Sequence, residues 1–132
     1  MTIYSDLKAH TKAVIALALG DKTVAGDVNG NIIDQLGFDC GKIVIATGTV
    51  TAGTVVLKEI QESVNSEMSD ATVIPADAIN GDLTVLSTAN AITEVGYINS
   101  KRYVRPVFTF SATPNLIVGA VIEKAGAEYL PA

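Results

Sequence analysis

Turn-forming residue pairs recur about every ten positions in this sequence, and this spacing limits the folds open to the chain. The clearest pairs are Gly20-Asp21, Asn29-Gly30, Ala52-Gly53 and Asn80-Gly81. The segments between them are short and rich in β-branched residues, so they suit strands and leave no room for a long helix. We expect hairpin turns at Asn29-Gly30 and Asn80-Gly81, because both residue types tolerate the positive φ angles that such turns need.

The segments between the turns predict an all-β fold. We predict a single domain over residues 11–132, an antiparallel β-sandwich of jelly-roll type whose sheets bury Val, Ile, Leu and the three Phe side chains. Residues 1–10 lack periodicity, and we expect them to form an extended N-terminal arm. Short strands are expected at Thr23 to Val24 and Ile32 to Ile33. The strongest strand candidates are Ala13 to Leu19, Lys42 to Val50, Thr54 to Ile60, Leu83 to Leu86, Ile92 to Ile98, Arg102 to Ser111 and Leu116 to Glu123.

Two of these segments carry conflicting signals. In Arg102 to Ser111, apolar residues such as Phe108 alternate with polar ones such as Thr109, as in a strand with one face on a core. Pro106 cannot donate a ladder hydrogen bond, so we expect this strand to lie at a sheet edge or to contain a bulge. For Ala9 to Leu19, intrinsic propensity alone would favour an Ala-rich helix. We favour a strand there, because the run is short and ends at a turn signal.

Composition limits the partners. The chain carries 14 acidic and 9 basic residues, a formal net charge of −5 that repels polyanions, so we expect no nucleic-acid partner. No apolar run approaches the roughly 20 residues needed to span a bilayer, so we expect no membrane partner. The single cysteine, Cys40, cannot form an internal disulfide. The fold therefore needs no oxidising compartment, and we expect synthesis in the cytoplasm.

From Asp27 onward, three motifs occur in an order that suggests a relationship. The first is Asp34-Gln35-Leu36-Gly37-Phe38 followed by the run Ile43 to Val50, and the second is Leu57 to Ser63. The third and most distinctive is Val95-Gly96-Tyr97-Ile98 followed by Lys101-Arg102-Tyr103-Val104-Arg105. Together they resemble a family of small structural proteins encoded in the head gene clusters of tailed bacteriophages and prophages. Asn99 stands where such proteins often have Gly, and Asn also tolerates a left-handed backbone.

This resemblance implies a virion protein on a jelly-roll-like sandwich. The role it suggests is that of a decoration or cement protein, which binds the capsid exterior and stabilises the head. The implied partners are the major capsid protein and further copies of the same chain in a homo-oligomer. The implied location is the capsid surface of the virion, after synthesis in the bacterial host.

The third motif also points to an interaction surface on its own chemistry. Lys101, Arg102 and Arg105 place three of the nine basic residues within five positions, flanked by Tyr97 and Tyr103. Arg pairs with carboxylates through a planar fork, and Tyr buries a large area at a low cost in entropy. We therefore predict that these five residues form a protein interface.

An alternative reading of the same cations remains open. Arg102 and Arg105 could instead pair with carboxylates of their own chain across a sheet, with Glu59, Glu62 or Glu94 as the candidates. Such exposed pairs contribute well under about 1 kcal/mol each.

Catalytic and metal-binding patterns are weak. His10 is the only imidazole, and with Cys40 it cannot complete a structural zinc site. Asp27 to Asp34 resembles a calcium loop only superficially, because Gly stands fourth and Phe38 stands at position twelve. The pair Glu59 and Glu62 has no aromatic sugar platform beside it. We expect no enzymatic activity, no cofactor and no metal.

Three other functions stay open beside the decoration role. The first is a head–tail connector or tail component, which would occupy a single vertex or form a ring. The others are a soluble ligand-binding β-sandwich and an enzyme. Both of these need a deep pocket with convergent polar groups.

Overall fold

The computed structural model describes residues 12–81, 85–86, 88–111 and 113–127. Strands make up most of this part of the chain, joined by short turns and one 3-10 turn. In chain order the elements are β1 (Lys12–Lys22), β2 (Gly26–Asn29), β3 (Ile33–Asp34), β4 (Phe38–Ala52), β5 (Val55–Ser63), β6 (Thr72–Val73), η2 (Ala76–Ala78), β7 (Ile79–Asn80), β8 (Val85–Leu86), β9 (Ile92–Ile98), β10 (Tyr103–Phe110) and β11 (Asn115–Ala127).

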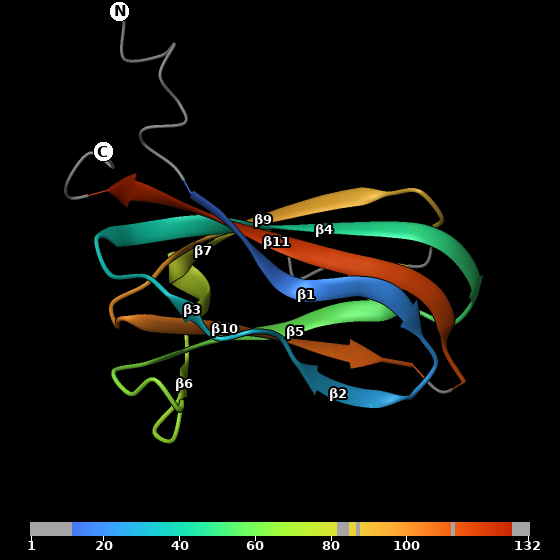
Figure 1. Ribbon diagram of the computed structural model, residues 1–132, viewed down its shortest axis with the longest axis horizontal. Helices are drawn as coiled ribbons and strands as arrows, with labels where there is room; N and C mark the ends of the chain where they lie inside the picture. The colour runs from blue at the N-terminus through green and yellow to red at the C-terminus, as the bar shows by residue number, and fades with distance from the viewer. Residues whose placement is uncertain (1–11, 82–84, 87, 112, 128–132) are drawn as a thin grey trace, which may run out of the picture.

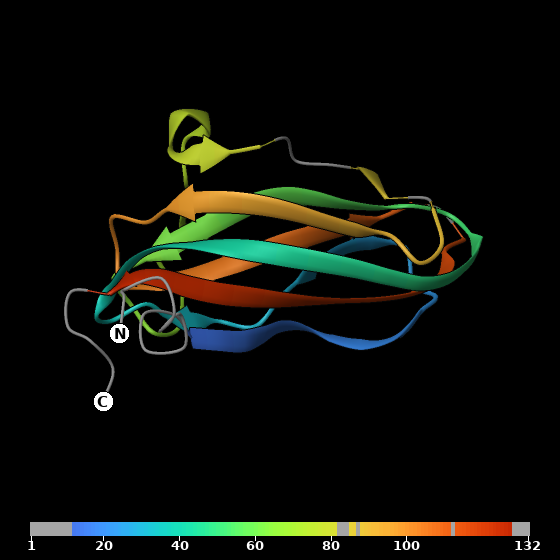
Figure 2. The same cartoon turned by 90° about the horizontal axis from the view of Figure 1, so that it is seen from above.

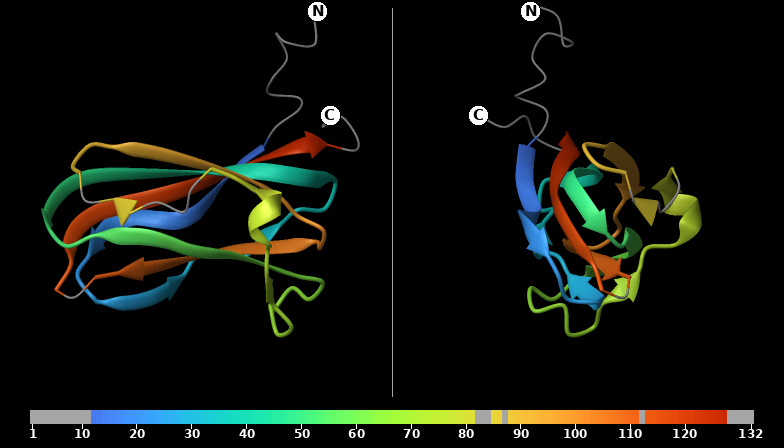
Figure 3. Two further views of the ribbon diagram at one scale, coloured as in Figure 1. Left: turned by 180° about the vertical axis from the view of Figure 1, so that it is seen from behind. Right: turned by 90° about the vertical axis from the view of Figure 1, so that its right-hand side faces the viewer.

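Two antiparallel sheets pack face to face. Sheet A has the strand order β1-β11-β4-β9-β7. Sheet B has the order β2-β10-β5-β6, with β3 also pairing with β10 and β8 with β5. Sheet A lies above sheet B in Figure 1, and the end view of Figure 3 shows the two layers.

The pairing of the strands is nested, which defines the topology. The first strand pairs with the last, β2 with β10, β4 with β9, and β5 with β6. The chain is thus one long antiparallel ribbon folded back on itself. The pairs β1–β11 and β4–β9 lie in sheet A, and the pairs β2–β10 and β5–β6 lie in sheet B. This is the arrangement of a jelly roll, and it confirms the predicted all-β sandwich.

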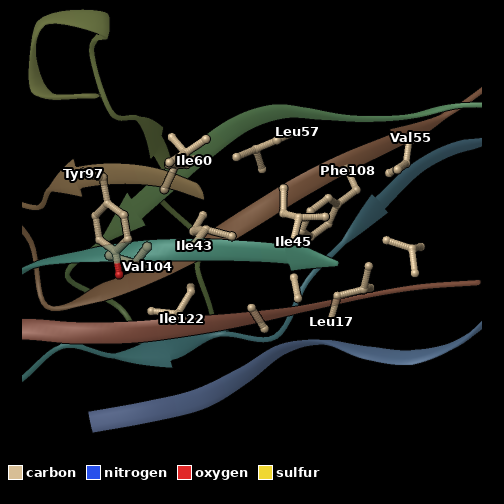
Figure 4. Packing of buried hydrophobic residues seen from close by; sticks show 14 of the residues in the cluster. Leu17, Ile43, Ile45, Val55, Leu57, Ile60, Tyr97, Val104, Phe108 and Ile122 are labelled. Carbon is tan, nitrogen blue, oxygen red and sulfur yellow. The ribbon is translucent and has the colours of Figure 1, made fainter. Parts of the chain in front are cut away.

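Alternating side chains explain why both sheets form around one core. Along β4, every second residue from Gly41 to Thr47 is buried, and Ile43 and Ile45 point into the sandwich. Phe108 of β10 is the largest fully buried side chain of the described residues and packs among these aliphatic groups (Figure 4). The core is otherwise built from Ala16, Leu17, Ile33, Val55, Leu57, Ile60, Ile74, Val95, Tyr97, Val104, Phe110, Leu116, Val118, Ala120 and Ile122.

Most of the predicted strands are present. Ala13 to Leu19 lies within β1, so the strand prediction is confirmed over the helix. The prediction at Thr23 to Val24 is wrong, because these residues lie in the connection before β2. At Ile32 to Ile33, only Ile33 is in a strand. Of the predicted strand Leu83 to Leu86, the first two residues lie outside the described residues, and the last two form β8.

Neither predicted hairpin exists. The strands β2 and β3 on either side of Asn29-Gly30 both run antiparallel to β10, so the chain continues in one direction past this point. The strands on either side of Asn80-Gly81, β7 and β8, belong to different sheets. Gly81 does have a positive φ of 111°, but the chain there leaves sheet A instead of turning back along it.

Close packing explains the step between β2 and β3. The Gly30 N–H donates to the carbonyl oxygen of Pro106 at 2.8 Å, and the Asn31 N–H donates to the carbonyl oxygen of Ala16 at 2.7 Å. A Cβ atom on Gly30 would lie 2.6 Å from that Ala16 oxygen and 2.7 Å from Cγ of Pro106. The absence of a side chain therefore lets the edge of β1 in sheet A approach β10 in sheet B.

The same contact explains how Pro106 is accommodated. The prediction of an edge strand is wrong, because β10 lies between β5 on one side and β2 and β3 on the other. The predicted bulge is confirmed by a register shift between Val107 and Phe108. Pro106 lies at the gap between β2 and β3, and its carbonyl faces Gly30 across this gap. In a strand, the N–H of a residue points the same way as its C=O, so the missing donor faces the gap and no ladder bond is lost.

The predicted N-terminal arm, residues 1–10, lies outside the described residues. Within the part of the chain that the structure describes, no helix has the length and apolar character needed to cross a bilayer.

Candidate protein interface

The β9–β10 turn, residues 99–102, lies at one end of the sandwich and carries two cations of the predicted interface, Lys101 and Arg102. The carboxylate of Glu62, at the end of β5 and only 5% exposed, holds this turn in place. It accepts hydrogen bonds from the Ser100 N–H at 2.8 Å, the Ser100 hydroxyl at 3.0 Å and the Lys101 N–H at 3.2 Å. A buried carboxylate needs such donors, and here the backbone of the turn supplies them.

A second buried side chain holds the turn from the other side. Gln35, only 1% exposed, donates from Nε2 to Oδ1 of Asn99 at 2.8 Å. Asn99 in turn donates from Nδ2 to the carbonyl oxygen of Lys101 at 2.9 Å. The turn is therefore fixed by hydrogen bonds from sheet B and from the β3–β4 connection.

Arg102 forms a two-point ion pair. Its Nε and Nη2 each donate to a different carboxylate oxygen of Asp34, both at 2.9 Å, and both side chains are about half exposed. The guanidinium also lies 5.0 Å from the ring centre of Tyr103. The hydrogen bond from Arg102 lowers the pKa of Asp34 below its ordinary value, and the same pairing raises the pKa of Arg102.

Lys101 and Arg105 donate hydrogen bonds to neutral groups, so unlike Arg102 their charges are not paired with a carboxylate of the described residues. Arg105 donates from Nη2 to Oε1 of Gln61 at 2.6 Å, and Gln61 donates onward to Glu59 at 3.0 Å. Lys101 donates from Nζ to the hydroxyl oxygen of Thr72 at 3.0 Å. Neither cation forms an ion pair with a carboxylate of the described residues.

The two tyrosines of the predicted interface differ in burial. Tyr103 is partly exposed beside Arg102 on the outer side of sheet B. Tyr97 is 2% exposed and lies in the core, so its inclusion in a surface is wrong. On β9, Val95 and Tyr97 point inward whereas Glu94 points outward, and the strand register places Tyr97 opposite Gly41 of β4. Burial raises the pKa of its hydroxyl well above the ordinary value.

The alternative expectation, that the arginines pair with carboxylates of their own chain, is correct for Arg102, but its partner differs from those expected. Arg102 pairs with Asp34 and not with any of the three glutamates considered. Of these, Glu62 holds the turn, Glu94 pairs with Lys42 at 3.3 Å, and Glu59 accepts from Gln61.

No family model matches the chain, and no curated protein matches its sequence. Among solved structures, the PBSX exported protein XepA superposes with a TM-score of 0.56 at 18% identity, over 92% of this chain. The chain shares its fold with XepA. It spans only 39% of the length of XepA. The SPBc2 prophage-derived protein YomS gives a TM-score of 0.47 at 12% identity, over 86% of this chain and 92% of YomS, and this score is too low to carry an argument.

The candidate site can bind through charge and hydrogen bonding. Within the described residues, no three His, Cys, Asp or Glu side chains gather where they could hold a metal ion. Asp27, at the start of the calcium-like stretch, instead accepts hydrogen bonds from Lys58 at 2.8 Å and from Thr109 at 2.7 Å. What the structure adds to the sequence prediction is the supporting pair Gln35 and Glu62. A polar residue near a strand end carries no sequence signal that it will be buried.

Proposed function

We propose that this protein is a structural component of a bacteriophage particle that binds the capsid exterior and stabilises the head. Its partner in this proposal is the major capsid protein, and its place is the capsid surface. The proposed role is one of binding, without catalysis and without a cofactor.

The observation that carries the proposal is the fixed geometry of the β9–β10 turn. Glu62 and Gln35 hold the turn that carries Lys101, and Gln61 accepts a hydrogen bond from Arg105, so both cations have little freedom to lose on binding. Both cations lack an internal carboxylate partner among the described residues. A chain of net charge −5 that presents two such cations at one end is suited to dock against an acidic protein surface.

The bacteriophage context has separate support. It rests on the resemblance of the motif from Val95 to Arg105 to proteins of phage head gene clusters. The coarser statement, that the chain is phage-related, agrees with the fold that it shares with the PBSX exported protein XepA. Jelly-roll sandwiches are a common architecture of viral capsid domains.

The test is an add-back experiment on purified phage particles that lack this protein. The double variant Lys101→Glu/Arg105→Glu is mixed with these particles, and bound protein is measured after pelleting. Reversing both charges replaces attraction with repulsion at the proposed contact, so we expect capsid occupancy to fall by at least about tenfold. Arg102 is kept intact in this experiment, because its pairing with Asp34 stabilises the fold.

The matched control is Lys22→Glu, a charge reversal at the opposite end of the sandwich, where β1 pairs with Leu116 of β11. It should bind like the wild type. Equal binding of the double variant and the wild type would remove the turn from the interface. A copy number that corresponds to a single ring at one vertex would instead indicate a connector or tail component.

A further inference from the structure

The chain contains two Asn-Gly pairs, Asn29-Gly30 and Asn80-Gly81, and neither forms the hairpin that the sequence predicts. An asparagine followed by glycine is chemically labile, because glycine has no side chain to shield its backbone nitrogen from the asparagine side chain. Both asparagine side chains are exposed. The two pairs therefore differ only in what surrounds the glycine.

The reaction open to such a pair is deamidation, which needs only the chain and water. The glycine nitrogen forms a bond to Cγ of the asparagine, the bond from Cγ to the side-chain nitrogen breaks, and ammonia leaves with the proton of the glycine N–H. Water then adds to a carbonyl group of the cyclic imide and opens it. Attack at the side-chain carbonyl gives aspartate, and attack at the backbone carbonyl gives isoaspartate.

Gly30 is held in place by its contacts. Its N–H donates to the carbonyl oxygen of Pro106 at 2.8 Å, and a Cβ atom there would lie 2.6 Å from the carbonyl oxygen of Ala16. To attack Asn29, the nitrogen of Gly30 must give up this hydrogen bond and its peptide plane must rotate. Such a rotation requires a local opening where β1 approaches β10. The fold therefore protects Asn29-Gly30.

Gly81 lacks contacts of this kind. It follows β7, a two-residue strand that pairs with β9 at the edge of sheet A (Figure 2). Its N–H donates no hydrogen bond to an oxygen atom of the described residues. Among these residues, the atom nearest to a Cβ on Gly81 would be the carbonyl oxygen of Glu94, at 3.6 Å. The nitrogen of Gly81 can therefore turn toward Asn80 without breaking a packed contact.

The surroundings of Asn80 leave room for the ring to close. Gly96 stands opposite Asn80 in the ladder, so no cross-strand side chain packs against the asparagine amide. Asn80 also lines a hollow of about 440 Å³, together with Gly96 and Ile98. This hollow gives water access to the imide that forms.

We propose that Asn80-Gly81 is a site of spontaneous deamidation in the folded protein, whereas Asn29-Gly30 is protected by the fold. Aspartate at this position adds a negative charge beside Asp77, which lines the same hollow. Isoaspartate adds a backbone carbon within β7 and disrupts its pairing with Gly96. The charge and the edge of sheet A therefore change as the protein ages. No partner takes part in this reaction, so the inference does not rest on the proposed function.

The test is incubation of the purified full chain in mildly alkaline buffer, which speeds ring closure by deprotonating more of the glycine nitrogen. Trypsin cleaves after Lys42 and Lys58, which places the two pairs in separate peptides. Mass spectrometry of these peptides gives the fractions of aspartate and isoaspartate at each pair over time. We expect Asn80 to convert at least about tenfold faster than Asn29, because the reaction at Asn29 waits for a local opening.

The matched control is the same chain unfolded in guanidinium chloride at the same pH. Both glycines are then released from their contacts, so the two rates should become similar. The variant Asn80→Gln should lose the product at this position, because its longer side chain closes a ring far more slowly, and conversion of Asn29 should not change. Equal rates in the folded chain, an Asn80 that stays intact, or a rate difference that persists after unfolding would overturn the proposal.

Discussion

Arg102 and Asp34 form a two-point ion pair that joins the end of the β9–β10 turn to β3, with both nitrogen–oxygen distances at 2.9 Å. The Asp34 carboxylate also accepts a hydrogen bond from the Leu36 N–H at 3.0 Å. The pair therefore fixes the short strand β3 and the turn that follows it. This places Arg102 in the structure of the domain, while Lys101 and Arg105 remain available to a partner.

Stability should depend on pH through this pair. Arg102 lowers the pKa of Asp34 in the folded chain below its ordinary value of 3.8, so between the two values the unfolded chain binds more protons. The stabilisation is therefore complete above about pH 5 and is lost as the pH falls through the folded pKa. Both side chains are about half exposed, so solvent screening keeps the effect on stability small. Urea unfolding at about pH 6 and pH 3 should show that Asp34→Asn destabilises the chain more at pH 6 than at pH 3. In an Arg102→Ala background, this difference between the two pH values should become smaller, and the hydrogen bond from the Leu36 N–H should account for what remains.

Substitution of Gly30 should destabilise the fold. In Gly30→Ala the new methyl group would lie 2.6 Å from the Ala16 carbonyl oxygen and 2.7 Å from Pro106, so β1 and β10 would have to move apart. We expect a loss of about 1–3 kcal/mol in the free energy of unfolding, measured by urea denaturation. Gly20→Ala is the control, because nothing lies within 4 Å of a Cβ atom there, and its effect should stay within about 0.5 kcal/mol. Equal effects of the two substitutions would show that the contact at Gly30 relaxes freely.

These contacts also show what the sequence could predict. The β-branched runs and their spacing were enough to predict the long strands and the sandwich, because both depend on local pattern and on the burial of alternate side chains. The path of the chain at Asn29-Gly30 could not be predicted in this way. There, the same residue types could form a hairpin turn or let the chain continue in one direction from β2 to β3. Which of the two forms depends on contacts with Ala16 and Pro106, which are distant in sequence.

The candidate interface could be predicted only in part from the sequence, for a similar reason. Three basic residues near one turn are visible in the sequence, but whether each one is neutralised depends on the strand register. The register brings Asp34 beside Tyr103 and so within reach of Arg102, and it brings Gln61 opposite Arg105. The exposed apolar side chains of β1, such as Ile15 and Leu19, did have a sequence signal, because Ala13 to Leu19 is apolar at every position instead of alternating. Such a run indicates apolar side chains on both faces of a strand.

Removal of the Glu62 carboxylate should loosen the β9–β10 turn. In Glu62→Ala the N–H groups of Ser100 and Lys101 lose their acceptor, and we expect a loss of about 2–3 kcal/mol in the free energy of unfolding. Hydrogen exchange of these two amides should become faster than in the wild type. Glu67→Ala, the same substitution at an exposed carboxylate, should change neither quantity. Unchanged protection of the two amides in Glu62→Ala would mean that another group fixes the turn.

The burial of Tyr97 leads to a prediction that separates the core from the interface. Its hydroxyl is buried without a hydrogen-bond partner among the described residues, so the oxygen lost water on folding and gained no hydrogen bond in return. Tyr97→Phe removes this oxygen and keeps the ring packed over Gly41, so the free energy of unfolding should stay the same or rise by up to about 1 kcal/mol. Occupancy on phage particles should not change, because the ring does not reach the surface. A destabilisation of more than about 1 kcal/mol in urea denaturation would reveal a partner for the hydroxyl, such as a buried water molecule bridging it to another polar group.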